Sequence, residues 1–260
     1  MAQPAPKQII ITGASSGIGT ALASAYAAPE ARLGLIARRE SALLALAARL
    51  DCQCSVYPLD VRDAAALQRA AADFMTRFGC PDVVIANAGV SQGTLTQYAE
   101  DLPAFQATLD INVMGMVNTF QPFLAAMREK RSGVLVGIAS VAGYRGLPGA
   151  AAYSASKSAA ISYLESLRVE LKRDGVQVIT VCPGYIATPM TENNPYPMPF
   201  IMSAEAAARK IVSIIRRRKS YAVFPWQMAW VASLLHMLPN WIYDRLFSRA
   251  PHKPRRGHGS

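Results

Sequence analysis

Apolar and polar positions alternate along the chain in blocks, and this pattern predicts short buried strands separated by helices. The strand-like blocks are continuous apolar runs, which are typical of a parallel sheet covered by helices on both faces. The expected strands are Gln8–Thr12, 31–37, 55–59, Val83–Ala86, 134–139, 176–182 and Tyr221–Phe224. The expected helices are 18–28, 41–50, Ala64–Phe78, 102–127 with a break or kink at Pro122, 153–173, 203–218 and 225–238. We therefore expect an α/β fold with a doubly wound parallel sheet.

Composition supports one folded domain with an unusual C-terminal part. The chain has 260 residues, of which 52% are hydrophobic, so it can bury a large core. We expect a single domain over 1–248, with a substrate lid and C-terminal helices in 190–247 and a disordered basic tail in 249–260. The net charge of +10 comes from residues 209–256, where eleven Lys and Arg side chains face one acid, Asp244. The appended C-terminal helical segment is therefore both apolar and basic.

Several classes of protein are excluded or disfavoured by simple counts. Four cysteines are too few for a disulfide scaffold in a chain of this length. All three histidines follow residue 230, and no cluster has metal-ligand spacing, so we expect no metal. No nucleic-acid reader motif accompanies the basic residues, and we expect no nucleic-acid partner. The N-terminus lacks an apolar signal core, which favours a cytoplasmic location.

A glycine-rich turn follows the first expected strand and opens the first expected helix. The turn reads Thr-Gly-Ala-Ser-Ser-Gly-Ile-Gly over residues 12–19. Glycines allow a tight turn and a close approach of the backbone to a pyrophosphate, and the helix N-terminus attracts negative charge. This placement favours a Rossmann-type dinucleotide site. The residues assigned to it are Gly13, Ser15, Ser16, Gly17, Ile18 and Gly19.

The end of the second strand indicates which dinucleotide binds. An NAD site commonly has an acid here, which accepts a hydrogen bond from the ribose 2′-OH. This chain has Arg38 and Arg39 instead, and guanidinium groups pair well with a 2′-phosphate. We therefore predict NADP(H), with Arg38 as the stronger candidate. After the third strand, Asp60 either accepts from the adenine amino group or caps the next helix, and Val61 beside it is also assigned to the cofactor.

Three residues form a candidate catalytic group. Tyr153 and Lys157 are four positions apart and share one face of a helix, and Ser140 follows the fifth strand, at the ligand edge of the sheet. A free phenol has a pKa of about 10, and a neighbouring cation is expected to lower it. A hydroxyl beside the phenol can hold a reacting carbonyl or alcohol oxygen. The combination predicts proton transfer to or from such an oxygen.

Taken together, these motifs resemble the short-chain dehydrogenase/reductase family over residues 8 to about 190. The resemblance covers the 12–19 loop, the Tyr-x-x-x-Lys pair and Ser140. It implies that the motif Asn87, Ala88, Gly89 steadies the sheet beside the cofactor, and that Asn112 is an active-site residue whose helix backbone holds a water for a proton relay. It also implies that a segment with Pro183, Gly184, Ile186 and Thr188 lines the nicotinamide. Members commonly pair through helices that correspond to 102–127 and 153–173, so a homodimer or homotetramer is expected.

The segments that follow suggest a hydrophobic substrate. Residues 191–202 are rich in proline and large apolar side chains, and we expect them to cover the substrate. The side chains expected to line an apolar pocket are Tyr196, Met198, Phe200, Ile201 and Met202. Residues 225–238 are apolar nearly all round, with three tryptophans in and after them. Either this element packs on a partner subunit or roofs the cleft, or residues 221–256 make a peripheral membrane contact.

The sequence thus predicts an NADP(H)-dependent oxidoreductase that acts on a carbonyl or secondary alcohol of a lipid-like, acyl or steroid-like compound. A second hypothesis is a non-catalytic NADP-sensing or scaffold protein on the same fold, although such a protein has no need of Tyr153 and Lys157 together. A third is epimerisation or dehydration on this fold, which the compact length disfavours.

Overall fold

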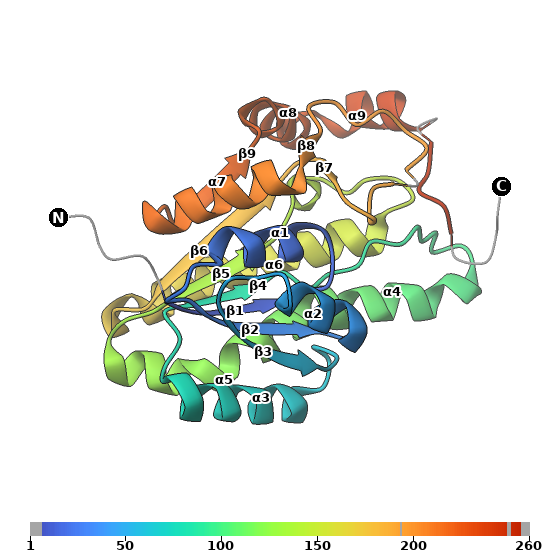
Figure 1. Ribbon diagram of the computed structural model, residues 1–260. Helices are drawn as coiled ribbons and strands as arrows, with labels where there is room; N and C mark the ends of the chain where they lie inside the picture. Colours follow the sequence, from blue (N-terminus) through green and yellow to red (C-terminus); the bar gives the residue numbers. More distant parts are fainter. Residues whose placement is uncertain (1–6, 193, 249–250, 256–260) are drawn as a thin grey trace.

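The central sheet has the predicted doubly wound parallel topology. The computed structural model describes residues 7–192, 194–248 and 251–255. Every neighbouring pair in the main sheet is parallel, in the order β3-β2-β1-β4-β5-β6-β9 (Figure 1). The strands are β1 (Gln8–Thr12), β2 (Arg32–Ala37), β3 (Gln53–Pro58), β4 (Val83–Ala86), β5 (Val134–Ile138), β6 (Gln177–Pro183) and β9 (Tyr221–Phe224). Chain order reverses between β1 and β4, where such sheets bind their ligands.

Helices cover both faces of the sheet, which explains the unbroken apolar strands. One face packs on α1 (Gly17–Tyr26), α2 (Glu40–Ala47) and α7 (Ala204–Arg216). The other packs on α3 (Ala64–Phe78), α5 (Gly115–Lys130) and α6 (Ala151–Glu170). In Figure 1, α3 and α5 lie below the sheet. Central strands β4 and β5 are buried at every position, because side chains on both of their faces meet helices.

The long helix expected over 102–127 is interrupted, but not at Pro122. It consists of α4 (Leu102–Leu109), a π-helical turn (Asp110–Met114) and α5, which continues through Pro122. The expected break at Pro122 is wrong. The neighbouring side chains Phe120 and Phe123 are fully buried, and their packing holds α5 together on both sides of the proline. The irregular turn contains Asn112 instead, and π-turns are frequent at functional sites.

The C-terminal part adds two short strands and two helices. Strands β7 (Ile186–Ala187) and β8 (Met202–Ser203) pair with each other and were not predicted. Helices α8 (Trp226–Met237) and α9 (Asn240–Phe247) lie together at the top of the molecule in Figure 1. Among the described residues, no helix is long and apolar enough to cross a membrane.

Part of the expected disordered tail is bound to the body of the protein. Residues 251–255 run beside Gly93, whose N–H donates to the Pro254 carbonyl oxygen at 3.3 Å. Arg255 forms ion pairs with Glu100 and Asp101. At these positions the structure shows contacts with the body where the composition, rich in Pro and Arg, predicts disorder. The rest of 249–260 lies outside the described residues.

Candidate active site

A cleft of about 320 Å³ opens at the carboxyl ends of the strands, where the chain order reverses between the paired strands β1 and β4. Nearly every residue that the sequence assigned to the cofactor or to catalysis lines this cleft. Those lining it are Gly13, Ser15, Ser16, Gly17, Ile18, Arg38, Arg39, Asp60, Val61, Asn87, Ala88, Gly89, Ser140, Tyr153, Lys157, Pro183, Gly184, Ile186 and Thr188. Gly19 and Asn112 lie behind its wall and support it.

The glycine turn has the geometry of an anion cradle. Gly13 and Gly17 have positive φ angles of 68° and 55°, which glycine adopts without strain. A Cβ on Gly19 would collide with the Gly13 carbonyl group, so only glycine allows α1 to approach the turn this closely. Within the described residues, no side chain caps the start of α1 and no acid occupies its first turn. Its free N–H groups therefore suit an anionic ligand.

The two arginines lie at the mouth of the cleft but differ in their contacts. Arg39 donates from Nη2 to the Ser15 carbonyl oxygen at 3.0 Å and to the Ser15 hydroxyl at 3.3 Å. Arg38 is exposed and lines the cleft, and among the hydrogen bonds of the described residues none involves its side chain. Arg39 therefore fastens the glycine turn to the second strand, whereas the guanidinium of Arg38 is available to a ligand.

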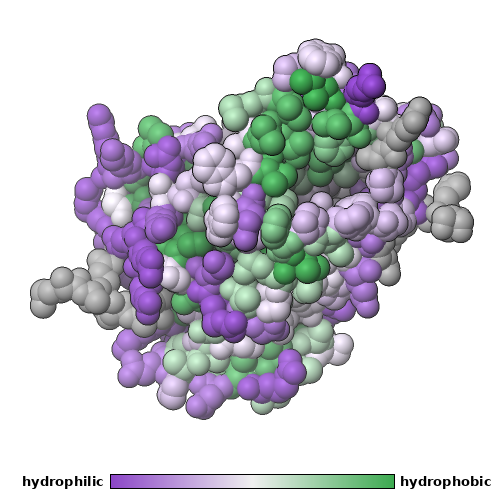
Figure 2. Space-filling view, turned by 90° about the horizontal axis from the view of Figure 1, so that it is seen from above, coloured by the Kyte–Doolittle hydropathy of each residue, from purple (hydrophilic) through white to green (hydrophobic). Residues whose placement is uncertain are grey.

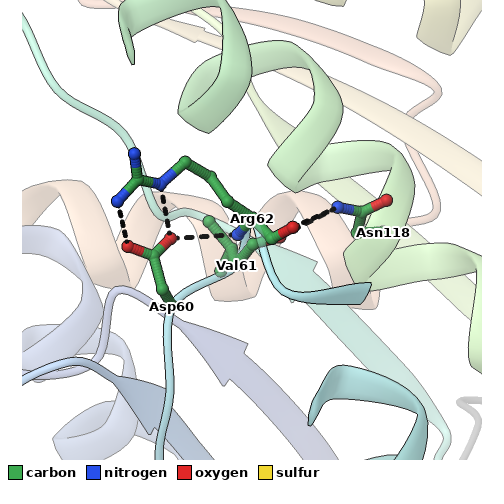
Figure 3. Close-up of polar contacts among 4 residues, drawn as sticks. All are labelled: Asp60, Val61, Arg62 and Asn118. Atoms are coloured by element: carbon green, nitrogen blue, oxygen red, sulfur yellow. Dashed lines mark hydrogen bonds and ion pairs between the residues drawn. The ribbon is translucent and has the colours of Figure 1, made fainter. Parts of the chain in front are cut away.

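Asp60 is held by an arginine rather than by the next helix. Its carboxylate accepts from Arg62 Nε at 3.1 Å, from Nη2 at 2.8 Å and from the Arg62 backbone N–H at 3.0 Å (Figure 3). These hydrogen bonds lower the pKa of the Asp60 carboxyl group. Helix α3 is capped by Asp63 instead, so the capping alternative for Asp60 is wrong. Asn118 donates to the Val61 carbonyl oxygen at 3.1 Å and fixes this loop against α5.

The candidate catalytic residues converge as their spacing predicted. Tyr153 and Lys157 project from α6, and Ser140 follows β5 and caps the short helical turn after it. The Ser140 hydroxyl accepts from the Ala142 N–H at 3.1 Å, which fixes its position. Lys157 Nζ donates to the Ile138 carbonyl oxygen at 2.8 Å and lies 5.7 Å from the centre of the Tyr153 ring. All three line the cleft.

The electrostatics of this group differ from the sequence-based expectation. Burial raises the pKa of Tyr153, while a hydrogen bond with Ser140 acts in the opposite direction. Burial also lowers the pKa of Lys157, to about 8. In this structure the loss of water at Tyr153 dominates, and the Lys157 ammonium donates to the Ile138 carbonyl oxygen, so the lowering of the Tyr153 pKa by Lys157 stays a prediction.

Asn112 contributes its side chain to the framework of the site. Its amide oxygen accepts from the Val90 N–H at 2.8 Å, and its Nδ2 donates to the Val90 carbonyl oxygen and the Ser156 hydroxyl, each at 2.9 Å. Ser156 in turn donates to the Tyr153 carbonyl oxygen at 2.7 Å. The side chain thus joins the segment after β4 to the first turn of α6. These hydrogen bonds use both Nδ2 protons of Asn112 within the framework of the site.

A second cavity of about 420 Å³ adjoins the cleft and shares Ser140, Tyr153, Gly184, Met190 and Thr191 with it. Its other lining residues are mostly apolar and come from distant parts of the chain. They are Ser91, Val141, Ala142, Tyr144, Arg145, Leu147, Pro148, Ala150, Tyr185, Asn194, Tyr196, Pro197, Pro199, Met228, Val231, Ala232, Leu235, Phe247, Pro251 and Lys253. A hydrophobic ligand fits such a cavity.

The lid was only partly predicted. Tyr196 lines the second cavity, but Met198, Phe200, Ile201 and Met202 do not, and Phe200 and Ile201 are about half exposed. Pairing of β8 with β7 turns this stretch away from the cavity. Sequence reasoning missed Arg145 and Lys253, for which no local pattern gives a signal. It also left open what 225–238 covers, and the structure places one side of α8 over the cavity.

The other side of α8 is exposed together with α9. The side chains of Trp226, Trp230, Leu234 and Met237 recur on one face of α8 and are 59–74% exposed. Trp241 and Leu246 of α9 are 72% and 62% exposed. Figure 2 shows the apolar area that these helices form on the upper side of the molecule. Exposed apolar patches of this kind commonly mark an interaction surface.

Comparison with known proteins identifies the class of enzyme. The family model "short chain dehydrogenase" matches residues 7–197. The chain therefore belongs to the short-chain dehydrogenase/reductase family, whose members are oxidoreductases that use a nicotinamide cofactor. The resemblance stated from the motifs is confirmed, as is the Rossmann-type fold.

Individual relatives extend over almost the whole chain. An "Uncharacterized oxidoreductase" of Myxococcus xanthus is 38% identical over 251 residues, which are 94% of this chain and 97% of that protein. The "11-beta-hydroxysteroid dehydrogenase 1A" of Arabidopsis thaliana is 34% identical over 84% of this chain and 68% of its own. A short chain dehydrogenase from Burkholderia cenocepacia, solved in complex with NADP, superposes with a TM-score of 0.80 at 25% identity, covering 94% of this chain and 98% of that one.

Proposed function

We propose that the protein is an NADP(H)-dependent oxidoreductase that transfers a hydride between nicotinamide and the carbonyl or secondary alcohol group of a hydrophobic substrate. The observation that carries the proposal is the junction of the two cavities at Ser140 and Tyr153. A dinucleotide in the first cavity and an apolar compound in the second would meet beside these two hydroxyl groups. The glycines of the turn suit the pyrophosphate of such a dinucleotide, and the arginines at the mouth suit the 2′-phosphate of its adenosine ribose.

The nicotinamide, when bound, supplies or accepts the hydride, and the protein supplies placement and the proton. Tyr153 donates a proton to the carbonyl oxygen as general acid, a role supported by its position in the lining of both cavities. Ser140 orients the same oxygen, since its hydroxyl is fixed by the Ala142 N–H. Lys157 places a cation in the lining of the cofactor cleft, 5.7 Å from the centre of the Tyr153 ring. The main chain of Asn112 in the π-turn is assigned to the return of the proton through water.

The preference for NADP(H) is supported by Arg38 and Arg39 at the end of β2, where no acid is present to bind a ribose 2′-OH. The Burkholderia structure with NADP is consistent with it. The apolar lining of the second cavity supports a lipid-like, acyl or steroid-like substrate, as does the similarity to the Arabidopsis hydroxysteroid dehydrogenase.

A turnover assay separates this proposal from a non-catalytic NADP-binding or scaffold role. Consumption of NADPH is followed with a panel of ketones that ranges from small to steroid-sized, and NADH serves as the comparison cofactor. We expect turnover with the apolar ketones and faster turnover with NADPH. Tight NADPH binding without any turnover would support the non-catalytic alternative. Formation of an epimer or of an alkene, with no net NADPH consumption, would support the third hypothesis, epimerisation or dehydration on this fold.

We also propose a peripheral membrane contact through the α8–α9 face within 221–256, with the catalytic body in the cytoplasm. Tryptophans suit the headgroup depth of a bilayer, and Arg245 lies on the exposed side of α9. The test is co-sedimentation with phosphatidylglycerol vesicles of the full chain and of a double variant, Trp230→Glu with Trp241→Glu. Both side chains are more than two-thirds exposed, so the fold should survive. Equal pelleting of the two proteins would end the membrane interpretation.

We propose a homodimer or homotetramer that pairs through α4, α5 and α6. Members of the family commonly pair through the corresponding helices, and this part of the surface carries exposed apolar side chains. Leu102, Met114 and Val169 are 68%, 51% and 63% exposed. Analytical ultracentrifugation of the protein and of Val169→Glu tests the proposal, and a monomer in both cases would contradict it.

A further inference from the structure

The described C-terminal residues form a strap across the second cavity. Pro251 and Lys253 contribute to the cavity lining, and the strap is fixed beyond them by Arg255. Arg255 Nε lies 2.8 Å from Asp101 Oδ2, its Nη2 lies 3.0 Å from Glu100 Oε1, and its guanidinium stacks 3.8 Å from the centre of the Tyr98 ring. The anchored strap therefore holds Lys253 at a defined position in the cavity wall.

The strap packs closely against the body of the protein at two glycines. A Cβ on Gly93 would collide with the Lys253 carbonyl oxygen, and a Cβ on Gly149 would come within 2.7 Å of the His252 Cβ. Glycine at these two positions lets the strap approach the body closely. The contact is therefore built by the body of the protein as well as by the strap.

Lys253 places a cation in this wall without a neutralising partner. Its ammonium donates to the Ser91 hydroxyl at 3.0 Å and to the Met190 carbonyl oxygen at 3.2 Å, both of which are neutral. Among the described residues, no carboxylate lies within ion-pair distance of it, and no acid lines the cavity. Partial burial lowers its pKa, the sign of a cation that has lost water without gaining an anion.

The other cation of the cavity is already committed. Arg145 Nη1 donates to the carbonyl oxygens of Leu235, His236 and Leu238, and its Nη2 donates to Asn240 Oδ1 at 2.9 Å. Its guanidinium also stacks on Tyr243 at 4.3 Å from the ring centre. Arg145 therefore fastens α8 and α9 to the body, whereas Lys253 retains an ammonium proton for a ligand.

We propose that Lys253 recognises a carboxylate of the substrate, so that the compound reduced or oxidised at Tyr153 is an apolar carbonyl or alcohol that also carries an acidic group. This inference rests on the proposed function and narrows its substrate class. A charge-assisted hydrogen bond in a partly dry cavity is strong enough to select an acid over its ester. Met190 contributes to both cavities, which places Lys253 near their junction but on the substrate side.

The test compares keto acids with their methyl esters. We assay linear keto acids of increasing chain length with NADPH. In each acid the ketone is the carbon next to the terminal methyl group, and the carboxylate is at the other end. We expect the wild type to prefer the acids at the best chain length. Lys253→Met should lower kcat/KM for that acid about 10- to 100-fold and change that for the ester little. Lys253→Arg should retain most of the preference, and Lys210→Met, which removes an exposed charge on α7, should match the wild type.

Calorimetric binding of decanoate and decanol separates this inference from the proposed function. Tighter binding of decanoate by the wild type, lost in Lys253→Met, supports the carboxylate site even if no ketone in the series is reduced; that result would count against the proposed function alone. Equal binding of decanoate and decanol by the wild type overturns the inference. An equal loss for acid and ester in Lys253→Met also overturns it, since Lys253 would then only hold the strap.

Discussion

The two cavities that meet at Tyr153 are built in different ways. The cofactor cleft is formed mainly by strand ends and the turns that follow them within residues 13–191. The substrate cavity is roofed by side chains from 190–253, including α8, α9 and the strap. The first lies almost wholly within the part of the chain that matches the family model, whereas much of the second lies beyond it. Substitutions should therefore separate cofactor binding from substrate selection.

The largest difference between the two cavities is expected from glycine substitutions, one at the cofactor cleft and one beside the substrate cavity. Gly19→Ala forces a Cβ against the Gly13 carbonyl group, and overpacking of this kind costs about 1–3 kcal/mol. The turn must shift, so NADPH affinity should fall by on the order of 100-fold. Gly146→Ala, on the substrate side, meets nothing within 4 Å and should leave unfolding free energy and NADPH affinity unchanged. Urea unfolding measures the free energy of unfolding, and fluorescence titration measures NADPH affinity. Similar effects of the two substitutions would contradict the difference proposed between the two cavities.

The next effect is on the choice of cofactor. Arg38→Ala should lower kcat/KM for NADPH about 10- to 100-fold and leave that for NADH unchanged, because a lost hydrogen bond to a charged group costs about 1.5–3 kcal/mol. Arg39→Ala should act less selectively, since Arg39 already bonds to Ser15. Arg69→Ala on the exposed side of α3 is the control. Equal losses with both cofactors in Arg38→Ala would show that this arginine does not read the 2′-phosphate.

A smaller effect is expected when the roof of the substrate cavity is loosened. Arg145→Ala removes the guanidinium at the carboxyl end of α8, where a cation is worth about 1–2 kcal/mol. The KM for an apolar ketone should rise roughly tenfold, and amides of α8 and α9 should exchange hydrogen faster. NADPH affinity should not change. Weaker NADPH binding in this variant would mean that the two cavities are coupled.

The mildest probe is pH. Because burial lowers the pKa of Lys157 to about 8, its ammonium is protonated below that pH and lost above it. The kcat/KM for NADPH, which reports groups of the free enzyme, should be flat below pH 8 and about halved at pH 8. Lys157→Met should abolish this step. A rise of kcat/KM through pH 8 would contradict the assignment.

The same contrast determines how much could be predicted from the sequence. The glycine turn, the arginines and the Tyr-x-x-x-Lys pair have fixed spacings on predictable elements, so the cofactor cleft could be assembled by residue number. The pKa of Tyr153 could not be predicted from the sequence, because it depends on burial and on where Lys157 donates its protons. The lining of the substrate cavity could not be predicted either. Arg145, Lys253 and the turn of Phe200 away from the cavity depend on contacts between segments far apart in the chain.

The most direct test of the central claim is the behaviour of Tyr153→Phe with NADPH and a ketone that the wild type reduces. The substitution removes only the hydroxyl that lies between the two cavities. We expect NADPH affinity to match the wild type and kcat to fall by about 100-fold or more, as for the loss of a general acid. Turnover within a few-fold of the wild type would contradict hydride transfer assisted by this phenol.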